Sequence, residues 1–277
     1  MIEIGNNISS FSTYSCHPNT KKELIVIIRS RIAEEGPECD LNDIDTSLIT
    51  DMSGLFIRSD FNGNISKWNT SNVTNMAYMF EKSKFTGDIS RWDVSNVKSM
   101  MYMFLNSRFN GDISKWNVTG TKDMCRMFSH SVFNQDISRW NVSNVTTMAY
   151  MFNSSKFNQD ISNWNTSNVG TMAYMFANSK FTADISNWDV SKVQDMAWMF
   201  YESEFNKPID NWDVSHVKYM AGMFSRSNFN QDISKWDISN VTSMAQMFYN
   251  SRFNQDISNW KIRKDCDTNR MFNECDI

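Results

Sequence analysis

Serine hydroxyls are the most regularly spaced groups in the chain that could perform covalent chemistry. A nucleophilic serine requires a positioned general base beside it. The three histidines, His17, His130 and His216, do not follow the spacing of the serines. We therefore expect the hydroxyls to bond backbone groups at helix ends, and we expect no catalytic residue and no enzymatic activity. These serines each precede a Phe by two residues, at Ser59, Ser83, Ser107, Ser131, Ser155, Ser179, Ser203, Ser227 and Ser251.

A column of aspartates has the same spacing and could supply carboxylate ligands to calcium. Each repeat offers only one carboxylate at this position, without a Gly-rich ligand loop. Neighbouring carboxylates would also repel one another if all of them pointed the same way. Capping of a turn by each carboxylate is therefore favoured over a calcium site. The column comprises Asp88, Asp112, Asp136, Asp160, Asp184, Asp232 and Asp256.

The cysteines form neither a disulfide framework nor a typical metal-binding motif. Their number is odd and no C-x-x-C pair occurs among Cys16, Cys39, Cys125, Cys266 and Cys275. A zinc site built on Cys16, His17 and Cys39 would lack a fourth ligand. The sequence therefore predicts no metal site and no cofactor.

A 24-residue repeat accounts for these columns. The tryptophans recur at this interval without an insertion, from Trp68 and Trp92 to Trp260. Two further columns contain all but two of the 20 Met, and another two contain all but one of the 20 Phe. Such a period is typical of proteins whose units bury their apolar faces against their neighbours. The methionines therefore belong to the core and not to copper or redox chemistry.

Apolar spacing within residues 85–108 predicts one short strand and one short helix in each repeat. Trp92 and Val94 lie two residues apart, so they would face the same side of a strand. The apolar residues at positions 97, 100, 103 and 104 fall within one stripe of a helix. Ser95 or Asn96 could cap the first turn of that helix. Each coil would thus belong to the α/β class.

The repeats form one elongated domain over residues 39–277, with about ten coils. Residues 1–38 form a separate N-terminal segment. At the other end, Asp265 and Thr268 replace apolar residues of the earlier coils. Polar replacements of this kind are typical of a terminal coil whose outer face meets water.

A capping helix is predicted over residues 21–35. Thr20 and Glu23 have the spacing of a capping box, and Gly36 followed by Pro37 is a stop signal. An apolar stripe that begins at Leu24 would cover the first coil. The apolar run is too short to span a bilayer. Binding to a membrane surface is a weaker alternative, because the end of the helix is acidic.

The repeat phrase "FNQDISxWxVSNVTxMAxMFxxSx" resembles that of the DUF285 family, also described as BspA-like leucine-rich-repeat surface proteins. The resemblance extends over residues 39–277. It implies a right-handed, leucine-rich-repeat-like solenoid and a location at the cell surface or outside the cell, with a role in adhesion. The chain shows neither an evident secretory signal nor a lipoprotein Cys. Its formal charge of −4 and the lack of a long basic run make nucleic acid an unexpected partner.

Two surfaces could bind a partner. The first is a column on the predicted helix, Tyr78, Tyr102, Arg126, Tyr150, Tyr174 and Trp198. If the segment is instead 3₁₀ or irregular, these rings would pack on neighbouring coils, and this structural role is slightly favoured. The change of the column to Gly222 and Gln246 further along argues against a role in stacking and for a local binding surface. The second is the polar strand face around Arg91, Asp93, Arg139 and Asn141.

These features together predict a non-enzymatic scaffold that recognises a protein or glycan partner, in adhesion or host recognition. The alternative is a structural spacer or self-assembling rod without a specific ligand. Asn-x-Ser/Thr triplets such as those at Asn72 and Asn144 could carry glycan in a secretory pathway. Turn and cap chemistry copied by the repeat explains them more simply.

Overall fold

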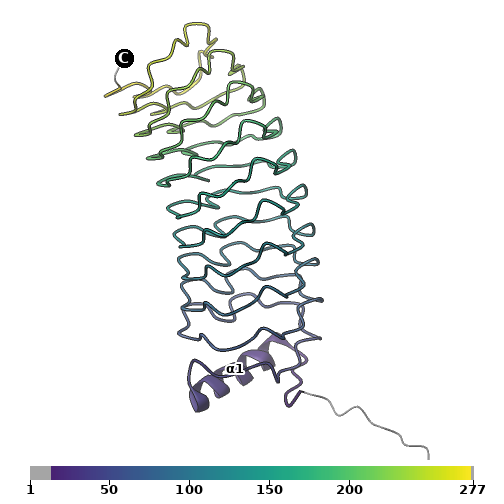
Figure 1. The fold of residues 1–277 in the computed structure, drawn as a ribbon. Coiled ribbons are helices and arrows are strands. Elements are labelled where there is room, and N and C mark those ends of the chain that lie inside the picture. The colour runs from purple at the N-terminus through teal and green to yellow at the C-terminus, as the bar shows by residue number, and fades with distance from the viewer. Residues whose placement is uncertain (1–13, 276–277) are drawn as a thin grey trace, which may run out of the picture.

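Each repeat forms one coil, and successive coils lie on one another along the molecule (Figure 1). The computed structural model describes residues 14–275. Parallel backbone bridges join equivalent residues of neighbouring repeats, from the pair Asp51 and Asn75 to the pair Ser243 and Asp267. The chain is a repeat protein, and its constant sequence period keeps equivalent residues of neighbouring coils in contact.

The segment predicted to be a helix in each coil consists of turns. Tyr102 N–H donates to the Cys125 carbonyl of the next coil at 2.8 Å, and the N–H groups two residues before and after it make equivalent bonds at 2.9 Å. Met103 N–H closes a turn onto the Met100 carbonyl at 3.1 Å. An α-helix would use these N–H groups within its own turns. The helix predicted for each coil is therefore wrong, and α1 (Lys21–Glu35) is the one α-helix among residues 14–275.

The strand predicted at Trp92 and Val94 is absent as well. Trp92 N–H closes a turn onto the Ile89 carbonyl at 3.2 Å. The parallel bridges lie elsewhere in the coil, at the position of Asn75 and Ser99. Trp92 and Val94 are both buried. Their two-residue spacing therefore identified core positions correctly, but a sequence of tight turns produces that spacing here.

The interior of the stack is built from columns of aromatic rings. Neighbouring rings are nearly parallel, with centroid separations of 5.6 Å for Phe80 and Phe104 and 6.3 Å for Trp68 and Trp92. The indole N–H of each column tryptophan has a buried acceptor, as when Trp164 Nε1 donates to the Ile137 carbonyl at 3.1 Å. A buried donor without a partner would be costly. Tryptophan thus combines a large apolar surface with a hydrogen bond between coils.

Polar side chains close the turns of each coil, buried serines on the inside and exposed aspartates at the surface. The Ser107 hydroxyl accepts from the Phe109 N–H at 3.1 Å, and the other serines of this column bond the equivalent Phe. Asp112 accepts from the Ser114 N–H at 2.9 Å in the same manner. The predicted turn capping by aspartate and the predicted backbone bonding by serine are confirmed. The serines cap turns, however, and not helix ends.

Helix α1 lies across the N-terminal end of the stack (Figure 1). The Thr20 hydroxyl accepts from the Glu23 N–H at 3.2 Å, and Gly36 ends the helix with a positive φ of 91°. Leu24 and Ile28 are buried in the same core cluster as the first coil. The helix therefore covers apolar side chains that would otherwise meet water.

Candidate functional site

A row of six side chains runs along one edge of the stack, and we call it the aromatic ladder: Tyr78, Tyr102, Arg126, Tyr150, Tyr174 and Trp198. Neighbouring rings stack on each other, at centroid separations of 4.6 Å for Tyr78 and Tyr102 and 4.4 Å for Tyr150 and Tyr174. Trp198 lies 6.0 Å from Tyr174 and extends the row. The row contains one member from each of six consecutive coils.

Arg126 joins the two halves of the aromatic ladder. Its guanidinium carbon lies 3.7 Å from the centroid of the Tyr150 ring and 5.6 Å from that of Tyr102. A planar cation between two ring faces is attracted by both of them. Arginine therefore fits the row as a flat group, and it places a positive charge in the middle of the aromatic surface.

Every member of the aromatic ladder occupies a left-handed backbone position. The φ angle is 60° at Tyr78, 56° at Arg126 and 60° at Trp198. A residue with a Cβ atom pays roughly 1–2 kcal/mol for this conformation. The hydrogen bonds between coils impose it, since the N–H group at this position donates to the next coil, as Tyr78 does to the Met101 carbonyl at 2.9 Å.

The rings expose their edges more than their faces. All six side chains are half-buried, and each inner member has a neighbour on both sides. Burial raises the pKa of Tyr78 and of Tyr174 above the ordinary value of tyrosine. A partner of this surface would thus contact ring edges, phenol groups and the Arg126 side chain.

Gly222 follows Trp198 in the same column because the indole fills the available space. A Cβ atom at Gly222 would lie 2.2 Å from Trp198 Cε3. The change from an aromatic residue to glycine was interpreted above as evidence against stacking. That interpretation is wrong, since the glycine accommodates the last and largest ring of the stack.

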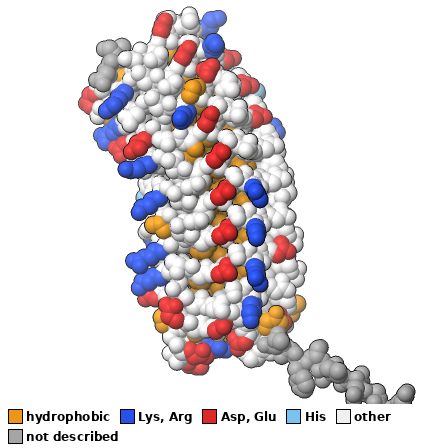
Figure 2. Space-filling view, in the orientation of Figure 1, with side chains coloured by type: hydrophobic (Ala, Val, Ile, Leu, Met, Phe, Trp, Pro, Cys, Tyr) orange, Lys and Arg blue, Asp and Glu red, His pale blue; other side chains and the backbone are white. Residues whose placement is uncertain are grey.

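The alternative surface around Arg91, Asp93, Arg139 and Asn141 is exposed and strongly polar. Asp93 accepts from the Ser95 N–H at 3.0 Å and Asn141 from the Ser143 N–H at 3.1 Å, so both side chains cap turns. Within the part of the chain that the structure describes, neither arginine is within 4.0 Å of a carboxylate. Figure 2 shows acidic and basic side chains in rows along one face of the stack.

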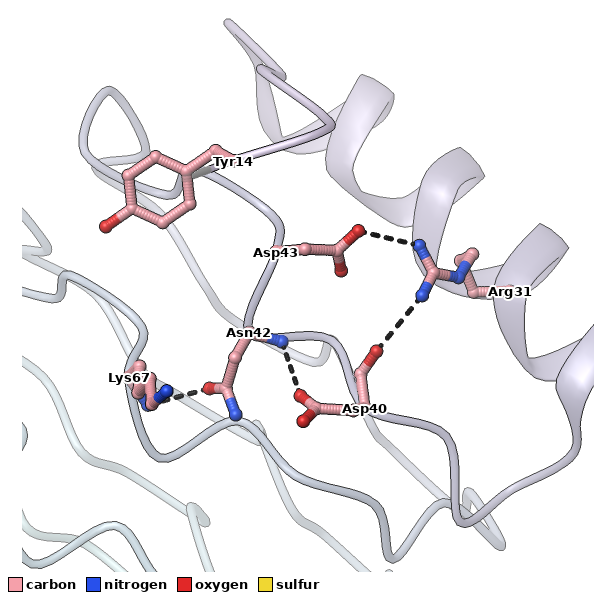
Figure 3. A pocket seen from close by; sticks show the side chains of 6 residues that line it. All are labelled: Tyr14, Arg31, Asp40, Asn42, Asp43 and Lys67. Carbon is pink, nitrogen blue, oxygen red and sulfur yellow. Dashed lines mark hydrogen bonds and ion pairs between the residues drawn. The ribbon is translucent and has the colours of Figure 1, made fainter. Parts of the chain in front are cut away.

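A cavity of about 440 Å³ lies between α1 and the first coils (Figure 3). Arg31 of α1 donates to Asp43 Oδ2 at 3.0 Å and to the Asp40 carbonyl at 3.2 Å. Asn42 accepts from the Lys67 N–H at 2.7 Å. Because most of these groups are paired with one another, the cavity primarily marks the place where α1 is fastened to the stack. The sequence contained no signal for this cluster, which brings together residues from separate segments.

Within residues 14–275, no three His, Cys, Asp or Glu side chains are grouped so that they could hold a metal ion. The five cysteines are not joined in disulfides. No helix of the described part has the length and apolarity needed to cross a bilayer.

Comparison with known proteins identifies the repeat. Among curated proteins and among solved structures, none matches the chain. The family described as "Mycoplasma protein of unknown function, DUF285" matches in three overlapping segments, residues 31–132, 106–204 and 177–277. These segments include every coil described above, so the family match and the repeated geometry concern the same residues. The chain belongs to the DUF285 family.

Proposed function

We propose that the chain is a non-enzymatic interaction scaffold whose aromatic ladder binds a protein or glycan partner. The observation that carries this proposal is the unbroken row of six half-buried planar side chains from Tyr78 to Trp198. Aromatic residues and arginine are the side chains most often responsible for affinity at interfaces. A role in adhesion or host recognition, from the cell surface or in secreted form, is our preferred biological setting.

Preorganisation is the physical advantage of this surface. Each ring is held by its neighbours and by a fixed backbone position, so a partner would order few side chains on binding. Immobilising a flexible side chain costs about 0.5–1.5 kcal/mol. The right-handed, leucine-rich-repeat-like winding implied by the sequence resemblance would give the row a constant direction along the molecule, and we retain it as part of the proposal.

The test compares two double variants on arrays of glycans and of cell-surface proteins. Tyr150→Ser with Tyr174→Ser removes adjacent rings of the aromatic ladder, and we expect at least about a tenfold loss of affinity for the bound partner, or about 1.4 kcal/mol. Arg91→Ser with Arg139→Ser alters the polar face and should bind like the unmodified chain. Because the two tyrosines stack at 4.4 Å, thermal unfolding must first show that both variants are folded at the assay temperature.

Two results would redirect the proposal. Loss of binding only in the arginine variant would move the site to the surface around Arg91, Asp93, Arg139 and Asn141. No binding on either array, together with concentration-dependent assembly in light scattering, would favour the spacer or self-assembling rod.

A further inference from the structure

The first coil has an empty position in line with the aromatic ladder. Gly54 stands one repeat before Tyr78 and has the same left-handed backbone, with φ of 64°. Among residues 14–275, a Cβ atom built on Gly54 would contact only Ile57 Cγ2, at 4.0 Å. The place where a side chain of the ladder would begin is therefore open.

Gly222 shows that glycine in this column does not by itself create a gap. At Gly222 a Cβ atom would meet three atoms of the Trp198 ring at 2.2 to 2.4 Å. The rings thus fill the glycine position at one end of the aromatic ladder and leave it open at the other. Within the described residues, the ring contact of Tyr78 is the one with Tyr102, so its opposite face carries no stacked ring.

The surroundings of Gly54 favour a neutral aromatic group. Ile57 is 43% exposed and lies beside the open position, so it offers apolar surface. The carboxylate of Asp51, three residues before Gly54, is already paired, because Lys21 Nζ lies 3.1 Å from Asp51 Oδ2 and also donates to the Ser53 hydroxyl. A guanidinium group would therefore gain less here than Arg126 gains between two tyrosines.

We infer that the gap at Gly54 is a docking slot for an aromatic side chain of a protein partner. That side chain would stack on Tyr78 and become an additional member of the aromatic ladder, with its edge against Ile57. This inference rests on the proposed function, since it specifies one chemical group that the partner presents. It also fixes the N-terminal limit of the binding surface at the first coil.

Indole is the probe, and it allows a test without knowledge of the partner. Indole is titrated into the full chain labelled with ¹³C at isoleucine methyl groups, and the spectrum is recorded by NMR. Stacking on Tyr78 should produce a saturable ring-current shift at the Ile57 methyl resonances, with a dissociation constant in the millimolar range. Arginine amide has no aromatic ring current, so it is tested as a competitor: at equal concentration it should leave the indole-induced Ile57 shift nearly unchanged.

Two variants at Gly54 control for the slot. Gly54→Tyr should fill it and abolish the shift, whereas Gly54→Asn tolerates the positive φ and should preserve most of it. Tyrosine already occupies this conformation at Tyr78 and Tyr102, so Gly54→Tyr is expected to fold, and its thermal unfolding is measured beside that of Gly54→Asn.

An unchanged Ile57 shift in folded Gly54→Tyr, or no saturable shift in the unmodified chain, would overturn the inference. Displacement of indole by an equal concentration of arginine amide would overturn the choice of an aromatic group. If the slot fails while the Tyr150 and Tyr174 variants still lose partner binding, the proposed function stands without it.

Discussion

At the scale of single residues, the column tryptophans connect neighbouring coils in two ways. Trp164 stacks on Trp188 at a centroid separation of 6.3 Å, and its indole N–H donates to the Ile137 carbonyl of the preceding coil. Leucine could fill part of this volume, but it could not provide the donor. The residue type is therefore determined by a buried carbonyl as well as by the core.

Replacement of Trp164 should separate these two contributions. Trp164→Ala should cost about 3–5 kcal/mol in the free energy of unfolding, because it leaves a large cavity. Trp164→Phe keeps a ring in the column but leaves the Ile137 carbonyl without its donor, at a cost of about 1–3 kcal/mol. Urea denaturation of both variants measures the difference. Equal stability of Trp164→Phe and the unmodified chain would show that the hydrogen bond is unimportant.

The two ladder glycines should respond differently to the same substitution. Asparagine tolerates a positive φ better than most residues, so Gly54→Asn should change the free energy of unfolding by less than about 1 kcal/mol. Gly222→Asn would place its Cβ 2.2 Å from Trp198 Cε3 and should be destabilising by about 1–3 kcal/mol through overpacking.

A second substitution identifies the cause of that loss. Trp198→Ala should make Gly222→Asn nearly neutral, because the clashing ring is gone. The measurement is a double-mutant cycle by urea denaturation. Additive effects of the two substitutions would contradict a clash with the indole.

At the scale of local elements, the sequence predicted α1 well because its signals are local. Thr20 and Gly36 flank the helix as its caps, and Glu23 lies in its first turn. The turns of each coil could not be predicted in this way, since Tyr102 N–H bonds the carbonyl of Cys125, which belongs to the next repeat. Periodicity identified the buried positions, whereas the backbone conformation depends on the neighbouring coil.

The candidate surface was predicted for its residues and not for its geometry. The aromatic ladder follows from one column of the repeat, so its members could be named from the sequence. Packing of these rings on neighbouring coils was weighed as the alternative to a helix, and the stacked rings confirm that alternative. The left-handed φ at Tyr78 and Trp198 could have been suspected from Gly54 and Gly222 in the same column.

Turn-capping carboxylates should give the coils a defined dependence on pH. The Ser95 hydroxyl and N–H lower the pKa of Asp93, while burial raises the pKa of Asp123. An aspartate whose pKa is lowered in the folded chain stabilises the fold at any pH above its pKa in the unfolded chain, about 3.9. This stabilisation is lost as the pH falls through the pKa of the folded chain. The raised pKa of Asp123 has the opposite effect on stability. The protonated carboxyl stabilises the folded chain below the unfolded pKa, and this contribution is lost as the pH rises through the folded pKa.

Asparagine substitutions at these two sites should therefore have opposite effects at pH 7. Asn69 and Asn75 already cap equivalent turns, so the hydrogen bonds can be preserved. Asp93→Asn should lower the free energy of unfolding and Asp123→Asn should raise it, each by less than about 1 kcal/mol because both side chains are partly exposed. Urea denaturation at pH 7 and pH 3 provides the measurement. Effects that are equally large at pH 3 would show that ionisation is not their cause.

At the scale of the whole molecule, the stack depends on neighbouring coils and on a constant period. Every inner coil contacts the one before and the one after it through the same bridges and ring columns. The stability of such a molecule is approximately a sum over coils and the interfaces between them. Folding should therefore depend less on the number of coils than on an unbroken 24-residue period.

Two deletions of almost equal size test this dependence. Removing residues 229–252 deletes one complete repeat and joins Asn228 to Phe253, so that every column continues across the junction. Removing residues 229–251 leaves Arg252 as an extra residue and shifts all later columns by one position. In paired backbones a shift of one residue moves buried side chains to the wrong side.

We expect the whole-repeat deletion to fold with one cooperative transition and a modest loss of stability, because only one coil and one interface disappear. The shorter deletion should expose the apolar columns that follow the junction and unfold or associate through them. Circular dichroism during heating and light scattering distinguish the two outcomes. The aromatic ladder from Tyr78 to Trp198 lies outside both deletions, so partner or indole binding should persist in the whole-repeat variant. Equal behaviour of the two variants would mean that the coils do not depend on a common register, and the stacking of the ladder would then need another explanation.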